Sequence, residues 1–324
     1  MPKKNNNSLI GADKNNDFLI GADPEFMCVE GREIVIADDE IDNAYSSRTK
    51  FGADGCGDTF EIRPSPSKCP IILVKNIRNI ILKKIYDSKY FLNYDWKAGS
   101  YYNGYSLGGH IHFGIKRIIK EKLGLHDTSI GDNIQINNYY NGITCILSQY
   151  LLPTYVLLEK PNHFLNRRRN YGQFNDYRIQ KHGIEYRALG SWLISPYITT
   201  AILCLAKIVM WEILNNEEFK REFDNTNYQK FITLNYYSII SRDNLDNFKE
   251  DIKILKKTYP KIWNDIENME LFNKFENEIK ILNELIMDNR TWYQKDNENN
   301  FIYNWGVNFN LKPKEQESRE EDIG

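Results

Sequence analysis

The chain has 324 residues, of which 41% are hydrophobic and 27% are charged, and its formal net charge is −2. This composition can bury a sizeable core, and the near-neutral charge argues against bulk electrostatic binding to nucleic acid or to an anionic membrane. The five cysteines are scattered and include no Cys-x-x-Cys pair, which indicates a reducing compartment and no structural zinc.

The two ends of the chain differ from the part between them. Lysines near the N-terminus have no apolar segment behind them, which predicts no secretory signal and a cytoplasmic location. We expect residues 1–17 to be a flexible leader. This segment contains SLIGAD, which resembles the later FLIGAD and is expected to be part of the leader or an edge strand. A single domain should cover 18–311, with a helical part from about 196. Residues 312–324 are charged and poor in apolar side chains, which predicts a disordered tail.

Two early segments alternate ionisable and apolar residues, as a strand with one polar face does. In GADPEF, Asp23 and Glu25 are two residues apart, and in FEIRP the same spacing separates Glu61 from Arg63. Each pair therefore points to one side of its predicted strand.

The region 38–58 lies between these segments and is rich in glycine towards its end, which predicts a lid or the rim of a site. Asp54 and Asp58 in this region could touch a substrate, but a turn is the commoner role for Ala-Asp-Gly. After the second segment, apolar residues at helical spacing predict a helix over 71–86 that covers the apolar face of the sheet.

The segment GGHIHFG predicts a strand with two imidazoles on one face. Because side chains alternate along a strand, His110 and His112 share one side, and Ile111 and Phe113 share the other. An isolated pair of this kind is as often solvated as functional. The arrangement suits a ligand or a metal if other ionisable pairs lie beside it.

A fourth alternating segment, IEYRA, places Glu185 and Arg187 on one face. If all four segments lie in one sheet, several carboxylates gather on a single face, where they repel one another unless cations intervene. Bound divalent metal and a phosphate-bearing substrate would reconcile this arrangement.

The later chain is mainly helical in pattern. We expect helices at 133–160 and 195–214, the second with Ser195 as N-cap and Pro196 at the first helical position. This apolar helix contains a lysine and a glutamate, so we interpret it as a buried core helix rather than a membrane span. The pattern of residues 217–289 predicts helices with polar breaks, and WYQKDNENNFIYNW predicts a closing loop or hairpin.

The motifs GADPEF, DGCGDTFEIRPSP, GGHIHFG and HGIEYRALGSW occur in the order found in one enzyme family. The chain resembles the phage-type carboxylate-amine ligases, or amidoligases, of the glutamine synthetase and glutamate-cysteine ligase superfamily, over roughly residues 18–195. The superfamily commonly has Glu-x-Glu where this chain has Asp23-Pro24-Glu25, so the aspartate must reach a metal with a shorter side chain. The resemblance implies an α+β fold: an antiparallel sheet of glutamine synthetase-like topology, helices over one face and a helical C-terminal part.

The resemblance also implies a mechanism. A substrate carboxylate attacks the terminal phosphate of ATP, and an amine then attacks the resulting acyl phosphate to form an amide or peptide bond. Mg²⁺, or Mn²⁺, would assist, because these ions bind carboxylate and phosphate oxygens. Expected substrates are small-molecule or peptide carboxylates and amines, in the cytoplasm of a bacterial host if a phage encodes the chain. The oligomeric state stays open, a homo-oligomer included.

The resemblance assigns roles residue by residue. The implied metal ligands are Asp23, Glu25, Glu61, His112 and Glu185, with His110 as an outer-shell or substrate group. Arg63 and Arg187 would face the transferred phosphoryl group or the substrate carboxylate, where a guanidinium gives bidentate contact. From the basic run NRRRNYGQFNDYR we select Arg169 and Arg178 for nucleotide or acyl-phosphate contacts, with a solvated basic loop as the alternative.

Three other functions remain as alternatives. GYSLG matches the nucleophile motif of serine hydrolases, but Ser106 lacks the apolar strand before it and the helix after it that the motif needs. His110 and His112 could hold zinc in a metal-dependent hydrolase, although carboxylates outnumber histidines. An inactive binding or virion protein of the same fold would carry the same motifs.

Overall fold

The computed structural model describes residues 17–41, 49–87, 93–125, 130–216, 245–292 and 300–306. The predicted tail and the predicted leader, apart from Asp17, lie outside these residues, as do 42–48 in the predicted lid and 217–244 in the predicted helical region. The boundaries of the predicted domain therefore stay a prediction.

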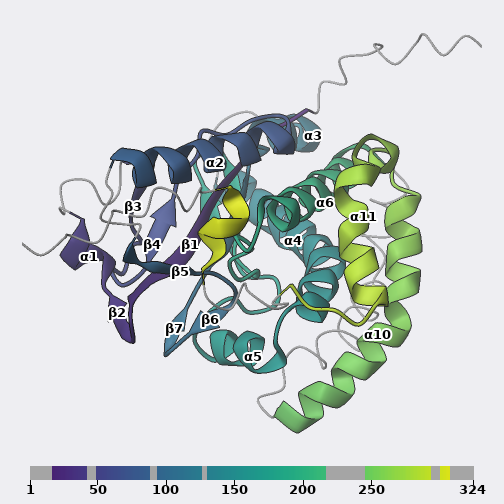
Figure 1. Cartoon of the computed structure of the whole chain (residues 1–324). Helices are drawn as coiled ribbons and strands as arrows, with labels where there is room; N and C mark the ends of the chain where they lie inside the picture. The colour runs from purple at the N-terminus through teal and green to yellow at the C-terminus, as the bar shows by residue number, and fades with distance from the viewer. Residues whose placement is uncertain are drawn as a thin grey trace, which may run out of the picture.

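An antiparallel sheet forms one layer of the molecule (Figure 1). Its main path runs β3-β4-β1-β8-β10-β9, and β2 and β5 pair with β1 outside that path. The strands are β1 (Ile20–Glu30), β2 (Glu33–Val35), β3 (Phe51–Ala53), β4 (Phe60–Ile62), β5 (Asp95–Lys97), β8 (Gly109–Phe113), β9 (Tyr177–Gln180) and β10 (Gly183–Tyr186). β6 (Tyr101–Tyr102) and β7 (Tyr105–Ser106) form a separate hairpin.

The long strand β1 is the centre of this sheet. Its first half, Ile20–Pro24, pairs with β8, and Glu25 and Phe26 pair with β4. Its second half pairs with β5 and β2. Pairing with β4 ends beside Pro24, which has no N–H for a further ladder bond. The carboxylates of β1 consequently lie beside two different strands.

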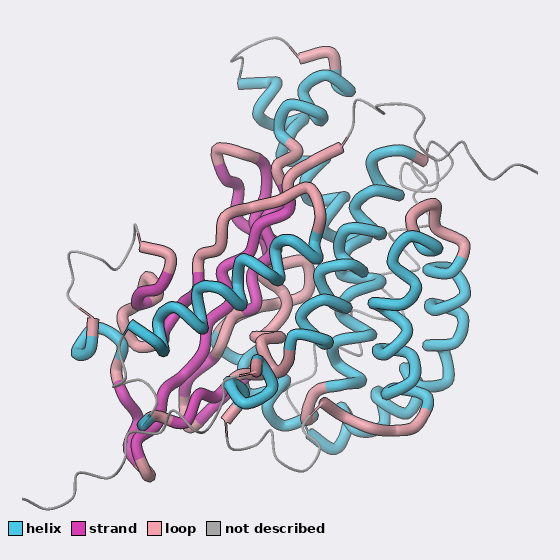
Figure 2. The backbone as a smooth tube through the Cα atoms, turned by 45° about the horizontal axis from the view of Figure 1, so that its top comes forward, coloured by secondary structure: helices cyan, strands magenta, loops and turns pink. Residues whose placement is uncertain are grey.

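Helices α2 (Pro70–Asp87), α4 (Ile130–Leu158) and α6 (Pro196–Asn215) pack on the apolar face of the sheet (Figure 2). The other helices are α1 (Ala37–Glu40), α3 (Lys116–Leu123), α5 (Pro161–Asn170), α10 (Leu245–Glu267) and α11 (Phe272–Met287). α2 contacts β1, β4 and α6, whereas α11 packs on α6 and α10 on α4 as an outer helical layer. The face with the ionisable residues is the one opposite to these helices.

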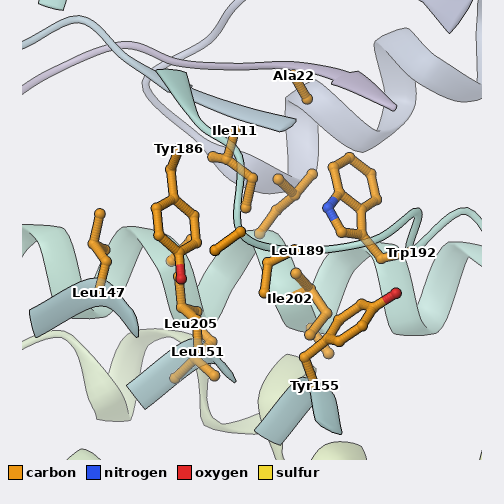
Figure 3. Packing of buried hydrophobic residues seen from close by; sticks show 14 of the residues in the cluster. Ala22, Ile111, Leu147, Leu151, Tyr155, Tyr186, Leu189, Trp192, Ile202 and Leu205 are labelled. Atoms are coloured by element: carbon orange, nitrogen blue, oxygen red, sulfur yellow. The ribbon is translucent and has the colours of Figure 1, made fainter. Parts of the chain in front are cut away.

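The apolar alternation of the strands builds the interface between sheet and helices. Ala22 of β1, Ile111 of β8 and Tyr186 of β10 are all buried and point towards the helices (Figure 3). Their neighbours there include Leu151 of α4 and Leu205 of α6. Burying each large apolar side chain contributes about 1.5–3 kcal/mol, so this interface fixes which face of every strand turns outwards.

The most apolar helix, α6, is a core helix as predicted. Ser195 accepts a hydrogen bond from the Ile198 amide at 3.2 Å, and Pro196 occupies the first helical position. By length and composition the helix could cross a membrane, but 83% of its apolar window is buried inside the protein. Lys207, the predicted charge in its middle, donates to Asp17 at 2.8 Å and to the Phe18 carbonyl at 3.0 Å.

The α+β class with an antiparallel sheet is confirmed, and so are the helices predicted at 71–86, 133–160 and 195–214, within three residues at each end. Of the two alternatives predicted near the C-terminus, a closing loop or a hairpin, the hairpin is wrong where the structure describes the segment. Phe301–Trp305 forms a 3-10 helix, because Asn300 caps its first turn by accepting from the Ile302 amide. Residues 293–299 of that segment lie outside the described part of the chain.

Candidate active site

Strand register brings the four predicted ionisable pairs onto one face of the sheet. Asp23 lies opposite His110 across β1 and β8, and Glu25 lies opposite Glu61 across β1 and β4. Further along β8, Glu185 of β10 lies opposite His112. Directly paired residues have neighbouring side chains, so four separate strands build one polar cluster.

Three side chains of this cluster converge as metal ligands would. One ligand atom from each of Asp23, His112 and Glu185 lies within 4.8 Å of the others, the one such group among the described residues. His112 Nε2 is 2.6 Å from Asp23 Oδ1. Ligands on opposite sides of an octahedral Mg²⁺ are about 4.2 Å apart, so small side-chain adjustments would let these three hold a divalent ion. Two carboxylates and one imidazole also suit Mn²⁺.

The polar face is not a solvated one, which corrects the picture of a polar strand face open to water. Glu25, Glu61, His110 and Glu185 are all buried, whereas Asp23 and His112 are partly exposed. The cluster is therefore desolvated as well as densely charged. Both conditions favour either protonation of some carboxylates or binding of a cation.

The carboxylates respond differently to this environment. Burial raises the pKa of Glu61 to about 9, and the charge of Asp23 acts in the same direction. Burial also raises the pKa of Glu25 to about 7, although the Gly108 amide donates to it at 2.6 Å. Burial acts on Asp23 too, but the hydrogen bond and charge of His112 outweigh it and lower the pKa of Asp23. Without a cation, Asp23 therefore stays ionised at neutral pH while its neighbour Glu61 holds a proton.

His110 lies deeper in the cluster than His112 and has different partners. Burial lowers the pKa of His110 to about 3, so its ring is neutral at neutral pH. Its Nε2 is hydrogen-bonded to the Tyr171 hydroxyl, and its Nδ1 is 3.5 Å from Glu185 Oε1. Arg187 donates to the Tyr171 oxygen at 2.7 Å and also lies 3.3 Å from Glu185 Oε1. Arg187, Tyr171, His110 and Glu185 thus form a closed ring of polar contacts.

The four predicted arginines are placed differently. Arg187 belongs to the ring, and Arg63 pairs with Glu61 while donating to the Ala53 carbonyl at 2.5 Å. Arg178 is about half exposed and lies 3.7 Å from Glu185. Arg169 is exposed on the last turn of α5, and its role towards a nucleotide stays a prediction.

Three polar side chains that contact the cluster were not predicted. Tyr171 follows α5, His182 lies in the turn between β9 and β10, and Gln180 ends β9 and donates to Glu185 at 2.6 Å. Only Gln180 had a sequence signal, because it is two residues from Arg178 and so shares its strand face. The other two lie outside strands, where no periodicity reveals the direction of a side chain.

The glycine-rich segment before β4 has the turn role that its sequence favoured. Asp54 Oδ1 accepts from the Gly57 amide at 2.8 Å, which closes the turn. Its charge also contributes to the raised pKa of Glu25, so this turn lies next to the cluster. Whether the segment acts as a lid stays a prediction.

The serine-hydrolase alternative does not fit the geometry. Ser106 ends the β6–β7 hairpin, whose Asn103 and Gly104 have φ of 41° and 104°, as in a type I′ turn. A nucleophile elbow requires the serine between a strand and a helix, whereas β8 follows here. The zinc-hydrolase alternative loses support as well, because the three side chains that converge as metal ligands include His112 but not His110.

One face of the antiparallel sheet carries a largely buried cluster of carboxylates, imidazoles and arginines, which defines a candidate active site. The model of one family, the Phage phiEco32-like COOH.NH2 ligase-type 2, matches residues 20–124 and 129–307, and the chain belongs to this family. The protein is therefore a ligase that joins a carboxylate to an amine. No curated protein matches the chain.

Proposed function

We propose that this ligase is ATP-dependent and forms an amide or peptide bond through an acyl phosphate, on a sheet of glutamine synthetase-like topology. The observation that carries the proposal is the convergence of Asp23, His112 and Glu185 on one face of the sheet, in a chain of a carboxylate–amine ligase family. The proposed substrates are a small-molecule or peptide carboxylate and an amine.

The proposed metal is Mg²⁺ or Mn²⁺, held by Asp23, His112 and Glu185. Glu25 and Glu61 lie beside this group and would contribute further oxygens once a cation is bound. Such an ion supplies charge neutralisation for phosphate oxygens. The raised pKa values of both glutamates support this proposal, because a site that must protonate its carboxylates in the absence of a cation is suited to bind one.

Arg187 is the arginine best placed to stabilise charge on a transferred phosphoryl group. Its guanidinium lies beside Glu185 and is held from one side by the Tyr171 oxygen. A guanidinium that is fixed before the reaction stabilises developing charge without reorganising, which is the usual source of large rate effects. In this proposal Arg63 orients Glu61, and Arg178, with its more exposed head group, meets the incoming nucleotide or carboxylate.

The test is incubation of the protein with Mg²⁺, ATP and pooled carboxylates and amines, followed by identification of the nucleotide product. ADP and phosphate that form only with both substrates would support the proposal, whereas AMP would indicate adenylation instead. Hydrolysis of a substrate without ATP would favour a hydrolase.

A variant makes the test specific to the site. Glu185→Gln should abolish ATP turnover, because it removes the charge of one proposed ligand and of the partner of Arg187. Glu33→Gln alters an exposed glutamate of β2 and should leave turnover unchanged. Full activity of Glu185→Gln would contradict the proposed site.

A further inference from the structure

A second imidazole stands directly behind the one in the proposed metal site. His182 Nε2 is 3.2 Å from His112 Nδ1, and the two ring centroids are 5.2 Å apart at an interplanar angle of 43°. The other nitrogen of His112, Nε2, faces Asp23. His112 is therefore held at both of its ring nitrogens, by a carboxylate on one side and by His182 on the other.

The fold fixes the place of His182, although its side chain is exposed. Its carbonyl oxygen accepts from the Lys116 amide at 3.1 Å, which ties the β9–β10 turn to the start of α3. The next residue, Gly183, packs against the end of β8, and a Cβ there would overlap the Phe113 carbonyl oxygen. The turn consequently lies close to β8 and keeps His182 in reach of His112.

A histidine binds a metal through an unprotonated nitrogen, and a partner for its other N–H fixes both the tautomer and the orientation of the ring. We propose that His182 is a positioning residue whose Nε2 accepts a hydrogen bond from Nδ1–H of His112, and so directs Nε2 of His112 at the centre formed with Asp23 and Glu185. This inference rests on the proposed function, since it concerns the metal site of that function.

The neighbouring histidine has a different partner. The Nε2 atom of His110 is hydrogen-bonded to Tyr171, and its Nδ1 lies 3.5 Å from Glu185 Oε1 and 3.9 Å from Asp23 Oδ1. Nε2 of His112 lies nearer to the centre, at 2.6 Å from Asp23 Oδ1. Each histidine of this strand thus has a partner behind it, Tyr171 for His110 and His182 for His112.

The experiment measures Mn²⁺ binding to the metal-free protein without ATP or substrates. His182→Leu removes the acceptor and should weaken Mn²⁺ binding about 10- to 100-fold, the usual effect of losing an outer-shell partner. His182→Gln offers a side-chain carbonyl as acceptor and should restore most of the affinity. Lys181→Ala, in the same turn, should bind as the unaltered protein does, and melting temperatures confirm that each variant is folded.

Imidazole ¹⁵N spectra give a second result that does not depend on a metal. The Nδ1–H signal of His112 should be protected from solvent exchange in the unaltered protein and in His182→Gln, and should lose its protection in His182→Leu.

Unaltered Mn²⁺ affinity in His182→Leu would overturn the inference, and so would unprotected Nδ1–H in the unaltered protein. Equal loss of affinity in the Gln and Leu variants would also overturn it, because it would show that His182 itself binds the metal. Failure of the unaltered protein to bind Mn²⁺ would instead contradict the proposed metal site, while the spectra would still decide whether His182 holds His112.

Discussion

Buried carboxylates make the candidate site costly for the fold when no cation is bound. Glu61 has its pKa raised to about 9 and Glu25 to about 7, so both take up protons that their unfolded forms release near pH 4.5. The two protonated glutamates contribute their full share to the free energy of unfolding below pH 4.5. This contribution is lost as the pH rises, to about pH 7 for Glu25 and to about pH 9 for Glu61.

Replacing Glu61 by Gln should therefore stabilise the metal-free protein in a pH-dependent way. Gln resembles the protonated acid, so the variant should match the unaltered protein near pH 4.5 and exceed it by on the order of 3 kcal/mol at pH 8. Thermal unfolding in EDTA across this range measures the difference. Glu33→Gln is the control, and parallel pH curves for Glu61→Gln and the unaltered protein would contradict the prediction.

Tyr171 offers a second test at the scale of one residue. Its ring lies between the guanidinium groups of Arg167 and Arg187, whose central carbons are 4.7 and 4.6 Å from the ring centroid. Tyr171→Phe keeps the ring but removes the oxygen that holds Arg187 and His110. We expect a loss of about 1–3 kcal/mol in unfolding free energy, because buried donors and acceptors lose their partner.

Tyr171→Phe should also lower kcat for ATP turnover more than it raises KM, because Arg187 would no longer be held in place. Tyr177→Phe is the matched control, since the Tyr177 hydroxyl makes only a 3.5 Å contact with the Asn137 carbonyl. Equal stabilities and rates for the two variants would show that the hydroxyl of Tyr171 has no special role.

Sequence alternation predicted the site residues that lie on strands, because a two-residue period fixes the side of the sheet that each one faces. Asp23, His112 and Glu185 were selected in this way. Tyr171 and His182 could not be, since each reaches the cluster from a segment whose position depends on tertiary packing. The resemblance to a family added the expected chemistry, but it could not show that His182 lies behind His112.

At the scale of elements, α6 shows how one charged residue is accommodated in an apolar helix. Lys207 is buried, its ammonium nitrogen lies 3.6 Å from the centroid of the Phe18 ring, and it donates to Asp17 and to the Phe18 carbonyl. These contacts tie the residues just before β1 to the core helix. Lys207 thus attaches the residues that precede the central strand β1 to the core.

Lys207→Met should destabilise the protein by about 2 kcal/mol, because the buried Phe18 carbonyl loses its donor. Chemical denaturation measures the change. Lys68→Met is the control: Lys68 also lies 3.5 Å from Asp17, but it is mostly exposed, and such pairs contribute at most about 1 kcal/mol. If both variants lost the same stability, the attachment of α6 to the start of β1 would not depend on burial.

Helices were predicted more closely than hairpins in this chain. α2 has apolar residues at helical spacing, whereas α6 is a long apolar stretch with a capping serine and a proline at its start. The β6–β7 hairpin was not predicted, because strands of two residues carry no period, although Asn103-Gly104 is a common sequence for a tight turn. Short elements depend on neighbouring segments rather than on their own pattern.

At the scale of the whole molecule, a bound cation should stabilise the fold. A ligand present at 100 times its Kd adds about 2.7 kcal/mol to the free energy of unfolding. We expect Mn²⁺ to raise the melting temperature in proportion to the logarithm of its concentration, and Asp23→Asn to blunt this response. An equal rise in both proteins would place the responsible ion outside the proposed site.

The double pairing of β1 links the site to the core in a further way. Asp23 and Glu25 belong to a strand that is hydrogen-bonded to neighbours along both edges, so their backbone amides cannot reach solvent by fraying of an end. In deuterium exchange these amides should be among the slowest and should exchange at the rate of complete unfolding. On this expectation, exposing Asp23 and Glu25 requires complete unfolding, so a folded molecule keeps these two proposed ligands in place.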